Sequence, residues 1–312
     1  MTNIEKSIIQ TLAFFDIFSY PLTESEIWKW LYKPGKKVAL SEIKNVLEDS
    51  EFLTDKVSKV EGFYSLKDRE NTCYRRKQNN NVAEHKYRRA IRLAKLYRFI
   101  PFIRMMAVCN SLAISNAKED SDIDFFIITK KNKIWLARFF SVLFIKIFGL
   151  RPADGANKDA FCLSFFIDES SLDIKKIMMH HQDLYSAYWV QQLMPIYNPD
   201  GLYEKFMKEN DWHKENLPNG YTNEFSKEVE ENRLSSWSGK VFRYIVSPPI
   251  FNRWLDTFYR KLQTKIISHN LSSMVNVDTR VIVNETMLKF HPNDRRELFY
   301  KKWRERLHTI LN

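Results

Sequence analysis

A nearly continuous apolar segment, IWLARFFSVLFIKIFGL, occupies Ile134–Leu150. A helix that is apolar on all sides has to be buried, either in a protein core or in lipid. The segment is shorter than the ~20 residues that a membrane-spanning helix needs. Arg138 and Lys146 also interrupt it. We therefore expect a helix buried in the protein core, with an interfacial membrane helix as the weaker alternative.

Three strand-length apolar runs surround this segment. They are FIRMMAVC at Phe102–Cys109, IDFFIIT at Ile123–Thr129 and FCLSFFI at Phe161–Ile167. The order strand, strand, helix, strand is typical of a sheet that a crossing helix covers. We expect an α+β fold whose small mixed-sheet core lies within residues 101–200.

The first 70 residues predict a separate small unit. Helices are expected over residues 4–17, from Thr23 and from Ala39, followed by short strands at Phe52–Thr54 and Gly62–Leu66. This order is that of a winged helix-turn-helix module. The third helix carries more acidic than basic residues, which favours a structural or protein-contacting role over DNA reading. Lys56 and Lys59 in the wing keep DNA contact open.

Positive charge is concentrated in two segments. The chain has a net charge of +11, yet residues 1–70 have 10 basic and 12 acidic side chains. Residues 71–100 have nine basic and one acidic, and residues 251–312 have 12 basic and six acidic. A polyanionic partner is therefore plausible, with solubility alone as the alternative.

Residues 68–81 are expected to form a polar linker, and the first basic segment, residues 71–100, continues with a helix expected from Asn81 to Phe99. Arg88, Arg92 and Lys95 share one face of that helix and could contact the phosphates of a nucleic acid. A solvated basic face is the simpler interpretation. Residues 201–312 are expected to form a largely helical, basic C-terminal region.

The cysteine content indicates a reducing compartment. The three cysteines, Cys73, Cys109 and Cys162, are odd in number and far apart in sequence, so we expect neither a disulfide framework nor a zinc site. The N-terminus lacks the basic-then-apolar order of a signal peptide. We expect a cytoplasmic protein without an integral membrane segment.

The segment VCNSLAISNAKEDSDIDFFIIT, residues 108–129, contains the residues best suited to binding a metal ion and phosphates. Asp122 and Asp124 are two residues apart at the start of an expected strand, so their side chains project from the same face. Two such carboxylates can hold Mg²⁺ together with substrate phosphates. The turn at Asn110–Ser111 precedes them and offers a hydroxyl and backbone N–H groups to phosphates.

This segment resembles the signature of the DNA polymerase β-like nucleotidyltransferases, in which a Gly-Ser turn precedes Asp-x-Asp at this spacing. The overall order is similar to bacterial minimal-type members that have an N-terminal winged helix. The resemblance implies that Asp122 and Asp124 bind Mg²⁺, as one or two ions, and that Asn110, Ser111 and Ser121 contact an NTP. It implies nucleotidyl transfer to an acceptor hydroxyl of RNA, a protein or a small molecule.

The chain departs from that signature in two places. Asn110 stands where the family has glycine, although Asn is the next most tolerant residue at positive φ. The expected third carboxylate is missing from FCLSFFI, and Asp159 and Asp168 flank that run. We assign Asp159 as the third catalytic carboxylate. The alternative is a catalytically degenerate protein that binds nucleic acid or a protein partner in regulation.

Overall fold

A six-stranded mixed sheet forms the centre of the protein. The computed structural model describes residues 1–100, 102–150, 158–179, 183–220, 249–266 and 269–311. The strands follow the order β7-β4-β5-β6-β9-β8, and β5 and β6 are the parallel pair among antiparallel neighbours. Their bounds are β4 Ile103–Val108, β5 Ile123–Thr129, β6 Phe161–Asp168, β7 Met194–Tyr197, β8 Val281–Val283 and β9 Met287–Phe290. The expected α+β class is therefore confirmed at the level of mixed helices and sheets.

The apolar segment forms the crossing helix α7 (Ile134–Ile147), as predicted. Parallel neighbours such as β5 and β6 need a crossover connection, and α7 supplies it. Helix α11 (Pro249–Ile266) packs on α7, where the rings of Phe139 and Tyr259 stack with centroids 4.0 Å apart. Within the described residues, no helix is both long and apolar enough to cross a membrane.

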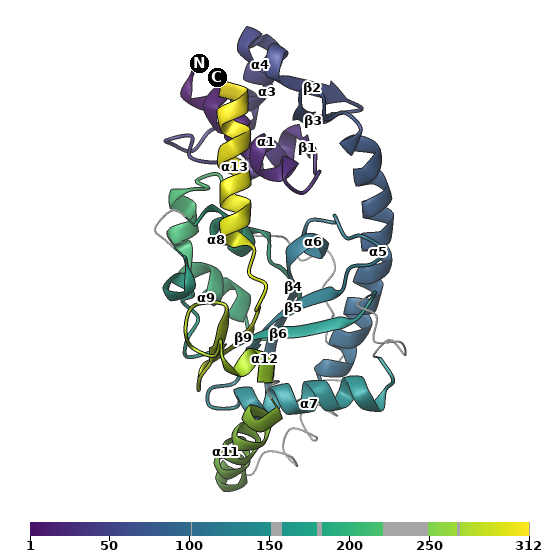
Figure 1. The fold of residues 1–312 in the computed structure, drawn as a ribbon, viewed down its shortest axis with the longest axis vertical. Coiled ribbons are helices and arrows are strands. Elements are labelled where there is room, and N and C mark those ends of the chain that lie inside the picture. Colours follow the sequence, from purple (N-terminus) through teal and green to yellow (C-terminus); the bar gives the residue numbers. More distant parts are fainter. Residues whose placement is uncertain (101, 151–157, 180–182, 221–248, 267–268, 312) are drawn as a thin grey trace.

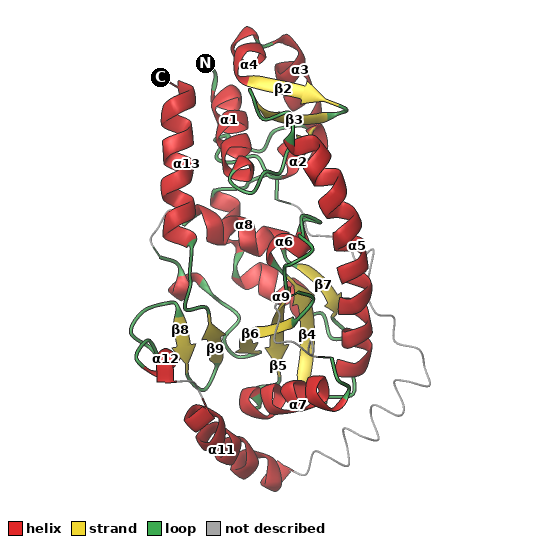
Figure 2. Ribbon diagram, turned by 45° about the vertical axis from the view of Figure 1, so that its right-hand side comes forward, coloured by secondary structure: helices red, strands yellow, loops and turns green. Residues whose placement is uncertain are grey.

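The two faces of the sheet carry different helices. Along β5, Ile123, Phe125 and Ile127 pack into the apolar cluster that includes α5 (Thr72–Tyr97) and α7. Phe126 and Ile128 alternate with them and pack with α8 (Leu184–Gln192) and α9 (Leu202–Glu209). In Figure 2, α5 runs alongside β7 and β4, and α8 lies above the strands. By the same alternation, Asp124 faces the α8 side.

Residues 1–70 fold into helices around a small sheet of order β1-β3-β2. The elements are α1 Asn3–Asp16, β1 Leu22–Thr23, α2 Glu24–Lys29, α3 Leu40–Asp49, α4 Glu51–Lys56, β2 Val57–Val60 and β3 Phe63–Leu66. The helix start at Thr23 is confirmed: the Thr23 hydroxyl accepts from the Glu26 N–H at 3.3 Å, and the Glu26 carboxylate accepts from the Thr23 N–H at 2.9 Å. The strand expected at Phe52–Thr54 is wrong. These residues lie in α4, whose start is capped by the Ser50 hydroxyl accepting from the Leu53 N–H at 3.2 Å.

The linker expected over residues 68–81 is also wrong from Thr72 onward, because α5 is one helix of 26 residues. Its first half is polar since it meets the N-terminal unit through polar side chains. Arg76 pairs with Glu26 at 2.7 Å, and its guanidinium lies over the rings of Tyr20 and Phe63. A helix held by such contacts shows no apolar periodicity in its sequence.

The C-terminal region is partly helical and partly sheet. Strands β8 and β9 form one edge of the central sheet, and α13 (Arg296–Leu311) lies beside α1, so both ends of the chain are together (Figure 1). The Trp303 indole donates to the Gln10 carbonyl at 2.9 Å, and Arg306 and Arg69 both contact Asp16, at 2.5 and 2.6 Å. The remaining short helices are α6 Asn110–Ala113, α12 His269–Ser272, η1 Lys175–Ile177 and η2 Asp211–Glu215.

Candidate carboxylate and thiol site

Asp122 and Asp124 lie at the start of β5, and Cys162 lies beside them on β6. The parallel register pairs Asp124 with Cys162. One oxygen of each carboxylate and the Cys162 sulfur lie within 4.8 Å of one another. Among the described residues, this is the one group of three or more His, Cys, Asp or Glu side chains placed to share a metal ion.

Asn110, in the turn after β4, fixes the position of Asp124. Its side-chain amide donates to the Asp124 carboxylate at 2.9 Å, and its own carbonyl oxygen accepts from the Tyr185 hydroxyl at 3.3 Å. The backbone of Asn110 has φ 56°, in the left-handed region that Asn tolerates better than most residues. The turn after β4 therefore both bends the chain and orients one carboxylate.

Burial makes ionisation of this group unfavourable. Burial, and next the neighbouring Asp124 charge, raise the pKa of Asp122 to about 6. Burial also raises the pKa of Asp124, although hydrogen bonds from Asn110 and Cys162 oppose that shift. Burial and Asp124 raise the pKa of the Cys162 thiol above its usual range, so this sulfur is a neutral donor near pH 7. A divalent cation between the carboxylates would relieve their repulsion.

The donor set fits a divalent cation, with one qualification for Mg²⁺. Mg²⁺ takes oxygen ligands, which Asp122 and Asp124 supply. A thiol is a ligand for softer ions, so Cys162 adds nothing to Mg²⁺ coordination. Two carboxylates would hold Mg²⁺ here, with the remaining positions left to water or substrate phosphates.

The structure does not group Asp159 with the two carboxylates. Its carboxylate accepts from the Lys86 ammonium at 2.7 Å, and this ammonium also donates to the Ser121 carbonyl at 2.6 Å. Lys86 is 1% exposed, so it needs the carboxylate as a partner. Asp168 lies at the other end of β6, in register with Thr129. Cys162, and neither flanking aspartate, stands beside Asp124.

The two serines predicted to contact a nucleotide, Ser111 and Ser121, have different surroundings in the structure. Ser111 lies next to Asn110 and lines a cavity of about 260 Å³ between α1, α6 and α8. The Ser121 hydroxyl donates to the Lys118 carbonyl at 2.8 Å, within its own turn. Ser111 is therefore open to a ligand, whereas Ser121 shapes the loop before Asp122.

The basic face of α5 is not part of this site. Arg88, Arg92 and Lys95 are exposed, and α5 covers the sheet face opposite to Asp124. Arg88 has an i,i+4 pairing with Glu84 at 3.6 Å. These cations form a separate surface behind the sheet.

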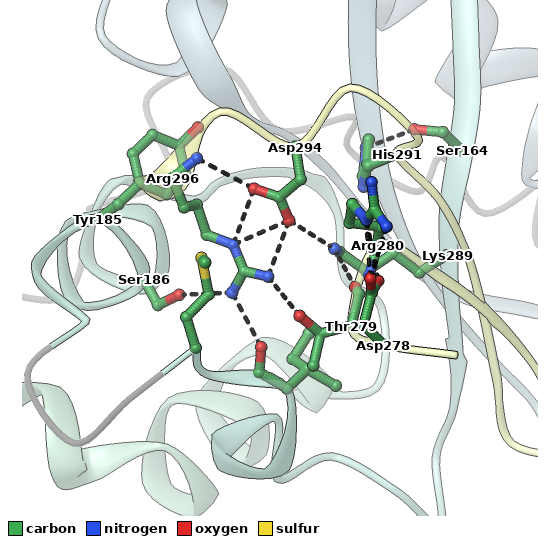
Figure 3. A network of polar contacts seen from close by, with 12 residues as sticks. Ser164, Tyr185, Ser186, Asp278, Thr279, Arg280, Lys289, His291, Asp294 and Arg296 are labelled. Atoms are coloured by element: carbon green, nitrogen blue, oxygen red, sulfur yellow. Dashed lines mark hydrogen bonds and ion pairs between the residues drawn. The ribbon is translucent and has the colours of Figure 1, made fainter. Parts of the chain in front are cut away.

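Sequence reasoning missed a polar network, drawn in Figure 3, that reaches the carboxylate and thiol group through the contact of Ser164 with Cys162. Its members come from β6, α8, β9 and the start of α13, and include Ser164, Lys289, His291, Asp294 and Arg296. His291 and Asn293 gave no recognisable motif. The network depends on β9 pairing with β6, a long-range contact that no local pattern encodes.

Comparison with known proteins gives no relative from which function could be transferred. No protein-family model, no curated protein and no solved structure matches this chain. The geometry of the site therefore has to carry the functional argument.

Proposed function

We propose that the protein is a Mg²⁺-dependent nucleotidyltransferase with a DNA polymerase β-like core and an N-terminal winged helix. The observation that carries this proposal is the placement of Asp122 and Asp124 at the start of β5, with Asn110 bonded to Asp124 and Ser111 beside it. Carboxylates that share one face of a strand are suited to a cation that also binds phosphates.

The reaction would be an in-line displacement at the α-phosphorus of an NTP. The oxygen of an acceptor hydroxyl forms a bond to that phosphorus, the bond to the bridging oxygen breaks, and pyrophosphate leaves. The hydroxyl proton passes to solvent. Asp122 and Asp124 would hold Mg²⁺, which would neutralise charge on the phosphates. Asn110 would keep Asp124 oriented, and Ser111 would contact a phosphate oxygen.

Two further features support the proposal. The N-terminal order of helices, short first strand and β2–β3 hairpin is that expected for a winged helix. Cys73, Cys109 and Cys162 are free thiols, which supports a reducing, cytoplasmic location.

The test is a thermal-shift panel of NTPs with and without Mg²⁺, on the wild type and on Asp122→Asn/Asp124→Asn. A ligand that binds the folded state raises the melting temperature by mass action. We expect one NTP to raise the melting temperature of the wild type by several degrees with Mg²⁺, and not that of the double variant. The proposal is wrong if no NTP shifts the wild type at millimolar concentration.

A second candidate function is a non-catalytic polyanion-binding protein. The observation that favours it is the thiol of Cys162 beside Asp124, where a third carboxylate would complete a catalytic group. The exposed Arg88, Arg92 and Lys95 then become the main functional surface.

Charge reversal separates the two functions. Arg88→Glu/Arg92→Glu/Lys95→Glu is expected to weaken binding of duplex RNA or DNA at least tenfold and to flatten its salt dependence. The variant should keep its NTP-dependent thermal shift, because α5 lies behind the sheet. Lys301→Glu/Lys302→Glu/Arg304→Glu, on the exposed side of α13, is the matched control. Equal losses in both variants would indicate non-specific charge binding and exclude α5 as a dedicated surface.

A further inference from the structure

A second cavity, of about 220 Å³, lies on the same sheet face as the carboxylates, between β6, β9, α8 and the start of α13. It connects to the carboxylate group at two points. Asn110 lines the cavity and donates to Asp124. His291 also lines it, and its Nε2 lies 2.9 Å from the Ser164 hydroxyl, which accepts from the Cys162 thiol at 3.2 Å.

One wall of this cavity is aromatic. Its side chains are Phe165, Tyr185, Trp189 and Phe299. Tyr185 and Phe299 stack on each other with ring centroids 5.5 Å apart. Flat apolar surfaces of this kind bind the body of an aromatic ligand.

Another part of the lining is basic. Lys289, Arg295 and Arg296 line it, and Asp294 is the carboxylate among the lining residues. Figure 3 shows Lys289 and Arg296 both directed toward Asp294. Asp183 lies 3.1 Å from Arg296 just outside this lining, so two carboxylates offset the three cations, and the remaining net charge of +1 favours an anionic occupant.

The buried cations are held in place before any ligand arrives. The Lys289 ammonium donates to the Thr279 carbonyl at 2.5 Å and lies 3.3 Å from Asp294. Arg296 contacts Asp294 at 2.8 Å and Asp183 at 3.1 Å. Side chains fixed in this way lose little entropy when a ligand binds.

The protonation states suit an anion as well. Burial, and next the Arg296 charge, lower the pKa of Lys289 to about 8, so the ammonium remains charged at neutral pH. Burial and the Lys289 charge lower the pKa of His291 to about 4, so its imidazole is neutral. At neutral pH the cavity is therefore lined by the charged ammonium of Lys289 and the neutral imidazole of His291.

The size of the cavity limits its ligand. At about 220 Å³ it is smaller than the ~300–1,000 Å³ of pockets for drug-sized molecules. The neighbouring cavity of about 260 Å³ shares Asn110, Tyr185, Trp189 and Phe299 with it but is lined by Ser111 and by none of the cations. The cavity on the Ser111 side is also below that range, so it would take only part of a nucleotide, and the 220 Å³ cavity would remain for a small second substrate.

We propose that the cavity lined by Lys289 and His291 binds the acceptor, a small aromatic acid whose anionic group lies against Lys289. This proposal rests on the proposed nucleotidyltransferase function. It narrows the acceptor from RNA, protein or small molecule to a small anion. The aromatic body would lie against Tyr185 and Trp189, with a hydroxyl directed toward Asn110 and Asp124.

Calorimetric titration with three probes tests the proposal, in metal-free buffer without nucleotide. The probes are 4-hydroxybenzoate, phenyl phosphate and the neutral 4-hydroxybenzyl alcohol. We expect the wild type to bind one of the two anions at least tenfold more tightly than the alcohol. The tighter of the two anions identifies a carboxylate or a phosphate as the recognised group.

Substitution of residues that line the cavity tests whether the probes bind there. Lys289→Met is expected to weaken anion binding at least fivefold and to leave binding of the alcohol unchanged. Arg295→Gln changes an exposed side chain at the rim, so it tests the same charge effect if Lys289→Met fails to fold. Lys301→Met, at an exposed position of α13, is the matched control.

The proposal for the acceptor cavity and the proposal for the nucleotide site can be refuted independently. Asp122→Asn/Asp124→Asn should still bind phenyl phosphate, which has no hydroxyl to meet Asp124, and Lys289→Met should still show the Mg²⁺-dependent shift with NTP. The acceptor proposal is overturned if no probe binds up to 10 mM, if the alcohol binds as tightly as the anions, or if Lys289→Met and Arg295→Gln both bind like the wild type.

Discussion

The Asp122 carboxyl group titrates within the range of ordinary buffers, with a pKa of about 6. Its folded-state pKa lies above the value of 3.8 expected for an unfolded chain. The group therefore contributes stability below about pH 4, and this contribution is lost as the pH rises through 6. Above pH 6 the ionised carboxylate weakens the fold.

Asp122→Asn should therefore stabilise the protein at pH 7.5 in metal-free buffer. The shift of the Asp122 pKa from 3.8 to about 6 corresponds to roughly 3 kcal/mol, and the partial exposure of the group reduces the expected gain in the free energy of unfolding to about 2 kcal/mol. The gain should shrink toward pH 4.5, where the native carboxyl is protonated. Urea unfolding at pH 4.5, 6 and 7.5 measures it. The exposed Asp120→Asn is the control, and a pH-independent effect of Asp122→Asn would contradict the assignment.

At the scale of elements, α13 stabilises α1 across nearly the whole length of the chain. Trp303 is 7% exposed, its ring meets Tyr32 edge-on with centroids 5.6 Å apart, and its indole donates to the Gln10 carbonyl. One side chain thus supplies both apolar contact and a hydrogen bond to the first helix.

Trp303→Ala is expected to lower the free energy of unfolding by about 3–5 kcal/mol, the usual effect of removing a buried Trp. Chemical unfolding monitored by far-UV circular dichroism measures the change. The neighbouring Lys302→Ala, on the exposed side of α13, should alter it by less than about 0.5 kcal/mol. If Trp303→Ala changed the free energy of unfolding by an equally small amount, this would show that α13 does not stabilise α1 through Trp303.

The sequence predicted the elements whose apolar pattern is local. β4, β5, β6 and α7 lie where the apolar runs placed them. Burial on both sides gives β4 and β5 an unbroken apolar signature, whereas α7 is half-buried and its end at Ile147 is exposed. The first half of α5 was missed because Arg76 and its neighbours contact other elements through polar groups. Cys162 was missed for another reason. Its place beside Asp124 depends on strand register, which spacing along the chain does not reveal.

At the scale of the whole molecule, the first 70 residues share their core with the rest of the chain. Phe14 and Phe15 are 3% and 0% exposed, and both rings contact Tyr188 on α8, with the Phe14 ring stacked at 4.2 Å. The same apolar cluster continues to Phe126 on β5 and Trp303 on α13. The domain boundary at residue 70 remains a prediction, and this shared core argues against independent folding.

A fragment of residues 1–70 should therefore lack fixed tertiary structure when produced alone. We expect helical far-UV circular dichroism with weak near-UV signal and poorly dispersed amide resonances. The full chain should instead unfold in one transition, with fluorescence and circular dichroism coincident. A well-dispersed spectrum of the fragment would establish an autonomous N-terminal domain.

The pairing of α1 with α13 also has a consequence during synthesis. About 280 residues separate the end of α1 from the start of α13. At ~5–20 residues per second, the ribosome needs roughly 15–60 s to make that stretch. For this time the apolar face of the first helix that meets Trp303 has no native cover. The nascent chain thus offers a binding surface to chaperones that the finished protein conceals.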